Sequence, residues 1–240
     1  MKILAVDSSG MVASVAVLED DDLIAEYTSN YKKTHSQTLL PMLDEVKKMI
    51  ELDLNTIDAI AIAEGPGSFT GLRIGSATVK GLGAALNKPI IPVPTVDALA
   101  YNLYGSSAVI CPLMDARRNQ VYTGLYTFEK NENTPDYRLE ILHEQFATGI
   151  SDVIDLINSF EREVIFLGDG VAVYKAFIEE HIKVPYTFAP AHCNRQRAAA
   201  VGAFGKVLFE NGISQTPTEH APEYLRLSQA ERERAGKEND

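Results

Sequence analysis

The chain has 240 residues, of which 45% are hydrophobic and 23% are charged, a composition typical of a globular protein with one large or two small domains. Its formal net charge of −11 argues against a protein that binds nucleic acid on its own. Two cysteines predict no disulfide framework, and no apolar segment is long enough to span a bilayer. Residues 1–4 enter a strand without a signal-peptide pattern, so we expect a cytoplasmic protein.

The first 50 residues predict three strands and a helix. The strands are expected over 2–6, 12–18 and 23–29, with a polar turn at 7–10 after the first of them. The helix that follows is apolar on more than one side, which is more than a single buried face requires. One of its faces carries Leu39, Leu43, Val46 and Ile50.

A strand, a glycine turn and a glycine-rich helix follow. Residues 57–63 form a run rich in isoleucine, typical of a strand buried on both faces. Gly65-Pro66-Gly67 predicts a turn, and Ser68 is expected to cap a helix over 69–86. Each glycine inside that helix costs about 1 kcal/mol relative to alanine, so we expect another backbone to approach it closely. The expected ridge of approach is formed by Gly71, Gly75, Val79 and Gly83.

The pattern continues with a strand and a helix and then restarts at Ser106. In the second part we expect strands over 108–114, 121–128, 138–145 and 164–167 and helices over 151–160, 171–181 and 197–211. The prediction is therefore an α/β protein with two similar β-β-β-α-β-α halves, the arrangement of the actin-like ATPase (ASKHA) fold. The halves are expected over 1–105 and 106–230, followed by a charged, disordered tail over 231–240.

Two aspartates at equivalent turns are candidates for holding a magnesium nucleotide. Asp7 and Ser8 lie in the first turn, and Asp115 begins a turn that continues with Arg117 and Arg118. The second turn lacks the glycines that let a backbone approach a phosphate, so an ion pair between Asp115 and the arginines is the preferred interpretation.

The glycine turn at 65–71 gives a second candidate anion site, because free amides at a helix N-terminus bind phosphate. Its spacing matches neither a Walker A loop nor G-x-G-x-x-G, and a tight corner between strand and helix is an equally good interpretation.

The five histidines and two cysteines do not form a recognisable catalytic or metal-binding motif. No pair of histidines has i, i+4 spacing, and His192 and Cys193 are sequence neighbours without a third partner. The sequence therefore predicts no catalytic residue, no metal site and no peptidase.

The helices beginning near Leu39 and Phe69 are expected to form a flat apolar pair. Either both are internal core helices or they pair with helices of another molecule in a four-helix bundle, and we favour the interface. The residues assigned to this interface are Leu39, Leu43, Val46, Phe69, Gly71, Leu72, Gly75 and Val79.

Five motifs together resemble the bacterial TsaB family, also called YeaZ, over essentially the whole chain. They are Val-Asp-Ser-Ser at 6–9, His-Ser-Gln at 35–37, Gly-Pro-Gly-Ser-Phe-Thr-Gly-Leu-Arg-Ile-Gly at 65–75, Asp-Ala-Arg-Arg at 115–118 and Pro-Glu-Tyr-Leu-Arg at 222–226. The resemblance implies the actin-like fold and a role in forming threonylcarbamoyladenosine beside the anticodon of tRNA.

The resemblance also implies a division of labour. TsaD is the catalytic transferase of this system, TsaE an associated ATPase, and TsaB a non-catalytic scaffold that pairs with TsaD through its first two helices or forms a related homodimer. TsaB would reach tRNA only through the complex and would bind ATP or ADP at most weakly. Thr95 and Leu99 would stand where TsaD carries its two metal-binding histidines. Arg73, Arg117 and Arg118 are candidates for a surface that faces TsaE or a nucleotide.

The alternative function is an active nucleotide-dependent phosphotransferase of the same fold, which would use Asp7 and Asp115.

Overall fold

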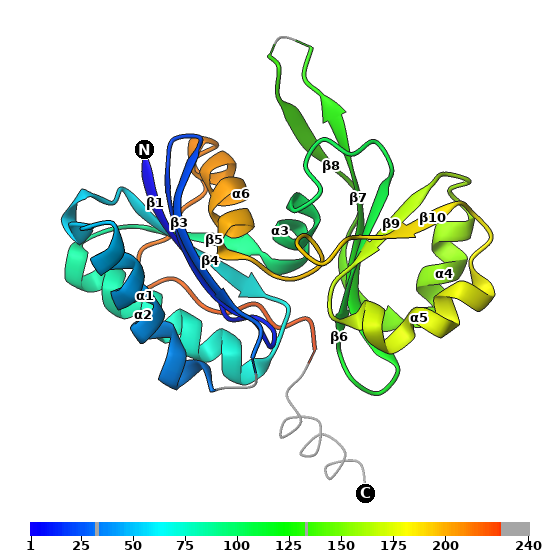
Figure 1. The fold of residues 1–240 in the computed structure, drawn as a ribbon, viewed down its shortest axis with the longest axis horizontal. Helices are drawn as coiled ribbons and strands as arrows, with labels where there is room; N and C mark the ends of the chain where they lie inside the picture. The colour runs from blue at the N-terminus through cyan, green and yellow to red at the C-terminus, as the bar shows by residue number, and fades with distance from the viewer. Residues whose placement is uncertain (32–33, 133, 227–240) are drawn as a thin grey trace, which may run out of the picture.

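Two five-stranded sheets form the framework of the computed structural model, which describes residues 1–31, 34–132 and 134–226 of the chain. The expected disordered tail over 231–240 lies outside the described residues. Figure 1 shows the sheets side by side, each with two helices on its outer face and with α3 and α6 between them. Along the chain the described residues contain no helix of the length and apolarity needed to cross a membrane.

The first half of the chain contains the first sheet, its helices and, at its end, helix α3. Its elements are β1 (Lys2–Asp7), β2 (Ala13–Glu19), β3 (Asp22–Ser29), α1 (His35–Met49), the short 3₁₀ helix η1 (Leu54–Thr56), β4 (Ala59–Gly65), α2 (Phe69–Leu86), β5 (Ile90–Pro94) and α3 (Thr95–Tyr101).

The second half of the chain repeats this order of strands and helices. Its elements are β6 (Val109–Asp115), β7 (Gln120–Lys130), β8 (Tyr137–Gly149), α4 (Ile150–Asn158), β9 (Val164–Leu167), α5 (Gly170–His181), β10 (Tyr186–Phe188) and α6 (Ala198–Glu210).

Both sheets have the same strand order. It is β3-β2-β1-β4-β5 in the first sheet and, read in the corresponding direction, β8-β7-β6-β9-β10 in the second. Each combines two antiparallel pairs with two parallel pairs. This repeated topology is the actin-like ATPase fold, which confirms the predicted fold class.

The central strands are buried on both faces because helices cover both sides of each sheet. Ile60, Ala61 and Ile62 of β4 are at most 1% exposed, as the uninterrupted apolar run predicted. The short strand β10 and helix η1 were missed, because three-residue elements carry too little periodicity to be recognised.

The last helix of each half covers the sheet of the other half. Helix α6 follows the second sheet in sequence, yet its Val201 and Phe204 pack against the first sheet. Helix α3 follows the first sheet, and its Val96 and Leu99 pack against the second. The boundary expected at 105–106 therefore separates the two sheets but not the two packing units. Figure 1 shows α6 beside the first sheet and α3 beside the second.

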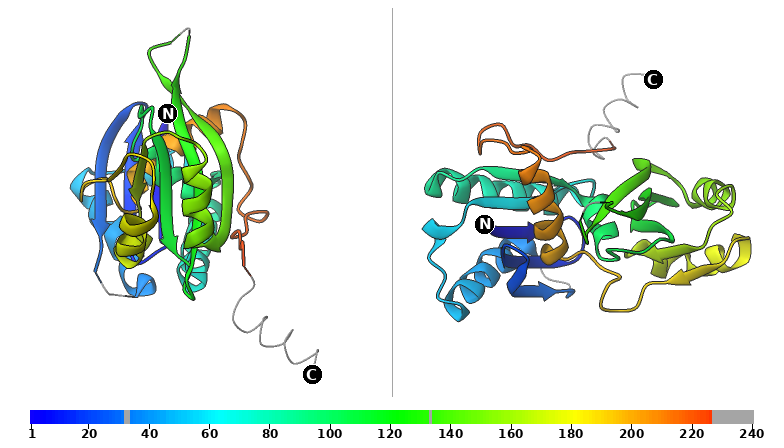
Figure 2. Two further views of the ribbon diagram at one scale, coloured as in Figure 1. Left: turned by 90° about the vertical axis from the view of Figure 1, so that its right-hand side faces the viewer. Right: turned by 90° about the horizontal axis from the view of Figure 1, so that it is seen from above.

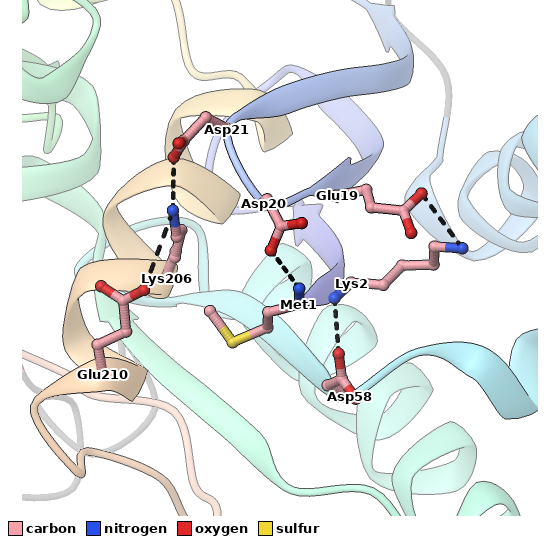
Figure 3. Close-up of polar contacts among 8 residues, drawn as sticks. All are labelled: Met1, Lys2, Glu19, Asp20, Asp21, Asp58, Lys206 and Glu210. Atoms are coloured by element: carbon pink, nitrogen blue, oxygen red, sulfur yellow. Dashed lines mark hydrogen bonds and ion pairs between the residues drawn. The ribbon is translucent and has the colours of Figure 1, made fainter.

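Ion pairs fasten α6 to the first sheet at both of its ends. Near its C-terminus, Lys206 forms an ion pair with Asp21, in the turn before β3 (Figure 3). Near its N-terminus, Arg197 forms an ion pair with Glu26 of β3 at 2.5 Å. The second pair is the more protected from water, because the Glu26 side chain is only 12% exposed.

Residues 213–226, the C-terminal strap, run back over the first half. Gln215 exchanges two backbone hydrogen bonds with Ile90 of β5. Lys80 of α2 donates to the carbonyl of His220 at 2.7 Å, and the Glu223 amide donates to the Glu64 carbonyl at 2.8 Å. The strap therefore joins β5, α2 and the end of β4, and Figure 2 shows it passing along one side of the molecule.

Helix α2 begins and ends where predicted, with the Ser68 hydroxyl accepting from the Gly71 amide at 3.3 Å. Three of its four glycines, Gly71, Gly75 and Gly83, face parts of the same chain. A Cβ at Gly71 would lie 2.1 Å from the Ser8 carbonyl oxygen, and one at Gly75 would lie 2.3 Å from Ser8 Oγ. Gly83 faces Pro217 of the strap in the same way. The predicted close approach is confirmed, but the approaching backbone belongs to this chain and not to a partner.

Replacing Gly71 by alanine should lower the free energy of unfolding by about 1–3 kcal/mol, because the new methyl group would overlap a backbone carbonyl that cannot move away. Gly81 is the matched control, since it lies in the same helix and a methyl group there would meet no atom outside the helix backbone within 4 Å. Gly81→Ala should raise the unfolding free energy by up to about 1 kcal/mol. Urea denaturation measures both changes, and equal effects of the two substitutions would contradict this packing.

Three carboxyl groups lie where the two halves and the strap meet: buried Asp97, half-buried Glu64 and exposed Glu223. Burial raises the pKa of Glu64 to about 7, and the nearby Glu223 and Asp97 carboxylates add to the shift. Burial also raises the pKa of Asp97 to about 6, opposed by a 2.7 Å hydrogen bond from the Tyr126 hydroxyl. Ionised Glu64 therefore destabilises the folded chain, because the same carboxyl is better solvated when the chain is unfolded.

The Glu64→Gln substitution should stabilise the protein in a pH-dependent manner. Because the folded pKa of Glu64 lies above the unfolded one, ionisation of this carboxyl lowers the stability of the native protein as the pH rises from about 4.5 to about 7, and the variant lacks this contribution. We expect the substitution to raise the free energy of unfolding by about 1–2 kcal/mol above pH 7 and not at all below pH 4.5. This value is already reduced to allow for the partial exposure of the Glu64 side chain. Thermal unfolding at several pH values measures it, with the exposed Glu45→Gln of α1 as control; a gain independent of pH would contradict the assignment.

Candidate functional site

The first candidate turn, at 7–10, is filled by the atoms of the chain itself. The Asp7 side chain is buried, and the amide and hydroxyl of Ser9 donate to its Oδ1 at 2.9 and 2.7 Å. Burial raises the pKa of Asp7 to about 6, although these hydrogen bonds oppose the shift. The carboxyl group therefore lies in the predicted turn, but its contacts serve the turn.

The turn is also fixed from both sides by neighbouring helices. Ser8 Oγ donates to the Gly71 carbonyl of α2 at 2.9 Å. His35 of α1 forms a 2.8 Å hydrogen bond through Nε2 with the Gly10 carbonyl. The role of His35 was not predicted, since the sequence marks it only as part of a family motif. The two helices and the first turn form one continuous unit.

The second candidate turn holds an ion pair. Asp115 accepts from the Arg117 amide at 2.9 Å and lies 3.3 Å from the Arg117 guanidinium. This confirms the preferred interpretation for Asp115 and Arg117. Arg118 is exposed and does not belong to this pair.

The backbone of the second turn is strained. Three consecutive residues have left-handed conformations, with φ values of 65°, 55° and 58° at Arg117, Arg118 and Asn119, each costing about 1–2 kcal/mol relative to the right-handed region. Arg226, at the end of the described strap, donates to the Ala116 carbonyl at 2.5 Å. The strap therefore reaches across both halves and helps to hold this turn.

Most residues assigned to a partner interface are part of the core. They are buried within the chain, so any interface on these two helices would have to use other residues. They are Leu39, Leu43, Val46, Gly71, Leu72, Gly75 and Val79. The apolar periodicity that identified them reports the inner face of each helix, because that face covers the first sheet.

The outer face of α2 is nevertheless unusual for a solvent-exposed helix. Along most of its length it carries small uncharged residues instead of charged ones: Ala77, Gly81, Ala84 and Ala85 are all exposed. Ala77, Gly81 and Ala84 follow one another at spacings of four and three residues, with Ala85 beside Ala84, so the four form one stripe along the helix. We call these four residues the small-residue stripe of α2. A helix surface of this kind allows another helix to approach closely.

Arg73 and Phe69, at the start of α2, contact the strap. The rings of Phe69 and Tyr224 stack with centroids 4.4 Å apart and an angle of 5° between their planes. Arg73 Nε donates to the Tyr224 hydroxyl at 3.1 Å, and its guanidinium lies 5.8 Å from both ring centroids. Tyr224 was missed as a structural partner, because a contact over 151 residues of separation leaves no local signal.

Thr95 and Leu99 of α3 are both 1% exposed. The Thr95 hydroxyl accepts from the Gly65 amide at 3.0 Å and so holds the glycine turn against α3. Among the described residues, no group of three His, Cys, Asp or Glu side chains is placed to hold a metal ion.

Comparison with known proteins gives consistent relatives. A family model described as "TsaD: tRNA N6-adenosine threonylcarbamoyltransferase" matches residues 22–234. The tRNA threonylcarbamoyladenosine biosynthesis protein TsaB of Bacillus subtilis (strain 168) is 32% identical over 231 residues, which cover 96% of each chain. The protein of the same name from Haemophilus influenzae is 32% identical over 76% of this chain and 78% of its own.

Solved structures agree with the sequence relatives. A crystal structure from Pseudomonas aeruginosa, described as an uncharacterized protein with similarity to peptidase YeaZ, superposes with a TM-score of 0.77 at 25% identity. The match covers 94% of this chain and 99% of that one. The chain belongs to the TsaB (YeaZ) family of tRNA threonylcarbamoyladenosine biosynthesis proteins.

Proposed function

We propose that this chain is a non-catalytic scaffold subunit of the tRNA threonylcarbamoyladenosine modification complex. In this proposal it acts in the cytoplasm, pairs with the transferase TsaD, supports its active form and helps to recruit the ATPase TsaE. The observation that carries the proposal is the exposed small-residue stripe of α2, which offers a helix surface for close packing where a solvated helix would carry charges.

The first turn supports a non-catalytic role. The Ser8 and Ser9 carbonyls lie against Gly71 and Gly67, where a Cβ would come within 2.1 and 2.3 Å of them. The glycines that could have let a phosphate approach instead let the chain pack on itself. The Asp7 carboxyl is buried and its Oδ1 accepts two hydrogen bonds from Ser9, so it is poorly placed as a metal ligand. We therefore propose that the chain has no resident nucleotide or metal cofactor.

The charge of the chain supports a role for partners in tRNA binding. A net charge of −11 opposes contact with a phosphate backbone, so we propose that tRNA is reached only through the complex. The outer face of α1 adjoins that of α2 and carries both lysines and carboxylates. The same surface would serve a homodimer in the absence of TsaD.

The small-residue stripe gives a direct test of the pairing surface. Ala77→Arg should weaken co-purification with TsaD from the same organism by at least tenfold, because a long charged side chain would prevent close helix packing. Ala176→Arg is the matched control, since Ala176 is exposed on α5 of the second half. Size-exclusion chromatography and titration calorimetry measure the pairing. Normal pairing of the Ala77→Arg variant would refute the proposed surface.

The second test concerns catalysis. The isolated chain should not hydrolyse Mg-ATP, and Asp7→Asn should support reconstituted tRNA modification at a rate within several-fold of the native protein, since asparagine keeps an acceptor oxygen for Ser9. In a reaction that contains TsaD, TsaE and tRNA, omission of this chain should abolish modification of the tRNA. Hydrolysis of ATP that is lost in Asp7→Asn would instead support the phosphotransferase alternative.

A further inference from the structure

The segment that carries the chain from the second half back to the first forms one wall of a pocket. Residues 189–197 join β10 to α6, and Figure 1 shows this segment passing between the two halves. The pocket has a volume of about 430 Å³ and opens beside the end of β3. Its lining is contributed by Val12, Thr28 and Asn30 of the first half and by Ala191, His192, Asn194, Arg195, Gln196 and Arg197 of the crossing segment.

The lining has the chemistry of an anion site. It contains two guanidinium groups, an imidazole, three amide side chains and a hydroxyl, and no aspartate or glutamate. In a chain with a net charge of −11, such a concave group of donors concentrates positive potential where an anion can enter. Its volume exceeds that needed for a bare inorganic anion and falls in the range of sites for small organic ligands.

The two arginines have different roles. Arg197 is neutralised by Glu26, which accepts from its Nε and Nη2 at 3.3 and 2.5 Å and also accepts from the Ala199 amide. Arg197 therefore fixes the wall at the start of α6. Within the described part of the chain, no carboxylate lies within ion-pair distance of Arg195, although its charge opposes the rise that burial causes in the pKa of the half-buried Asp169. Arg195 is the cation available to a ligand.

The backbone that presents Arg195 is fixed from both halves. The Gly168 amide, in the turn before α5, donates to the Asn194 carbonyl at 3.0 Å. Asn102, just after α3, donates to the Arg195 carbonyl at 2.8 Å. Gln196 is 2% exposed, and its amide group lies against Gly10 of the first turn. These contacts order the segment before a ligand arrives, so that binding does not have to order it.

We propose that this pocket binds a small organic molecule through an oxyanion group, a phosphate or a carboxylate, with Arg195 as its principal cation. A planar guanidinium offers two parallel donors to two oxygens of such a group, and His192 and Asn30 lie in the same lining. The pocket shares no lining residue with the two aspartate turns, although Val12 and Gln196 adjoin the first of them, and it does not depend on the proposed scaffold function. Because its walls come from the first half and from the crossing segment, a bound ligand would also hold that segment against the first half.

Titration of the full-length protein with inorganic phosphate, and separately with acetate, tests the pocket and distinguishes the two oxyanions. Calorimetry at low ionic strength should show saturable binding of at least one of them. Arg195→Gln should weaken that binding at least tenfold, whereas Arg195→Lys should weaken it less, because lysine keeps the charge without the planar donor pair. Circular dichroism melting checks that each variant is folded.

Two control variants locate the anion. Arg138→Gln removes an exposed arginine of β8 that pairs with Glu129 and Glu140, and it should bind like the native protein. Arg117→Gln tests the Asp115 turn and should also leave binding unchanged. Loss of binding in Arg117→Gln with normal binding in Arg195→Gln would place the anion at the turn and overturn the proposal. Absence of saturable binding of both oxyanions to the native protein would overturn it as well.

Discussion

The exchange of α3 and α6 between the two halves is the constraint on which the rest of the structure depends. A sheet that is apolar on both faces needs a layer on each side, and the outer helices cover only one side of each sheet. Phe204 of α6 completes the first core, and Leu99 of α3 completes the second. Neither half would be closed by its own sheet and outer helices alone, so we regard the two halves as one cooperative unit.

This exchange places the chain's connections at the junction and thereby shapes every candidate site there. The segment before α6 must cross the junction, which brings Arg195 next to Val12 and Asn30. After α6 the strap returns over the first half, which brings Glu223 to Glu64 and Tyr224 to Phe69. The carboxyl groups beneath the strap and the cationic pocket beside the crossing segment are thus consequences of one topology, and they give opposite local charges to two parts of the same junction.

The glycine-rich helix shows how one sequence feature serves two surfaces. On its inner side, Gly71 and Gly75 let the first turn approach so closely that Ser8 bonds directly to the helix backbone. On its outer side, Ala77 and Gly81 leave a smooth surface exposed. The inner surface of α2 packs against the first turn, where a nucleotide phosphate would have to bind. The outer surface is exposed and could contact a partner. Both properties are in keeping with the proposed scaffold role.

The sequence by itself determined the local structure. Apolar runs and turn residues determined most strands and helices, including the bounds of α2 and its Ser68 cap, because these depend on periodicity and on hydrogen bonds between near neighbours. The repeated order of elements was sufficient for the fold class, and residue types at Asp115 and Arg117 were sufficient for their ion pair.

Only the tertiary structure decided which surfaces are free. Leu39 and Val79 were expected at an interface, yet both are buried, since an amphipathic pattern shows that a face is covered but not by what. The strap contacts of Tyr224, the exchange of α3 and α6, and the pocket around Arg195 join residues that are far apart in the chain. Such contacts follow from the packing of whole layers, and a local pattern carries no information about them.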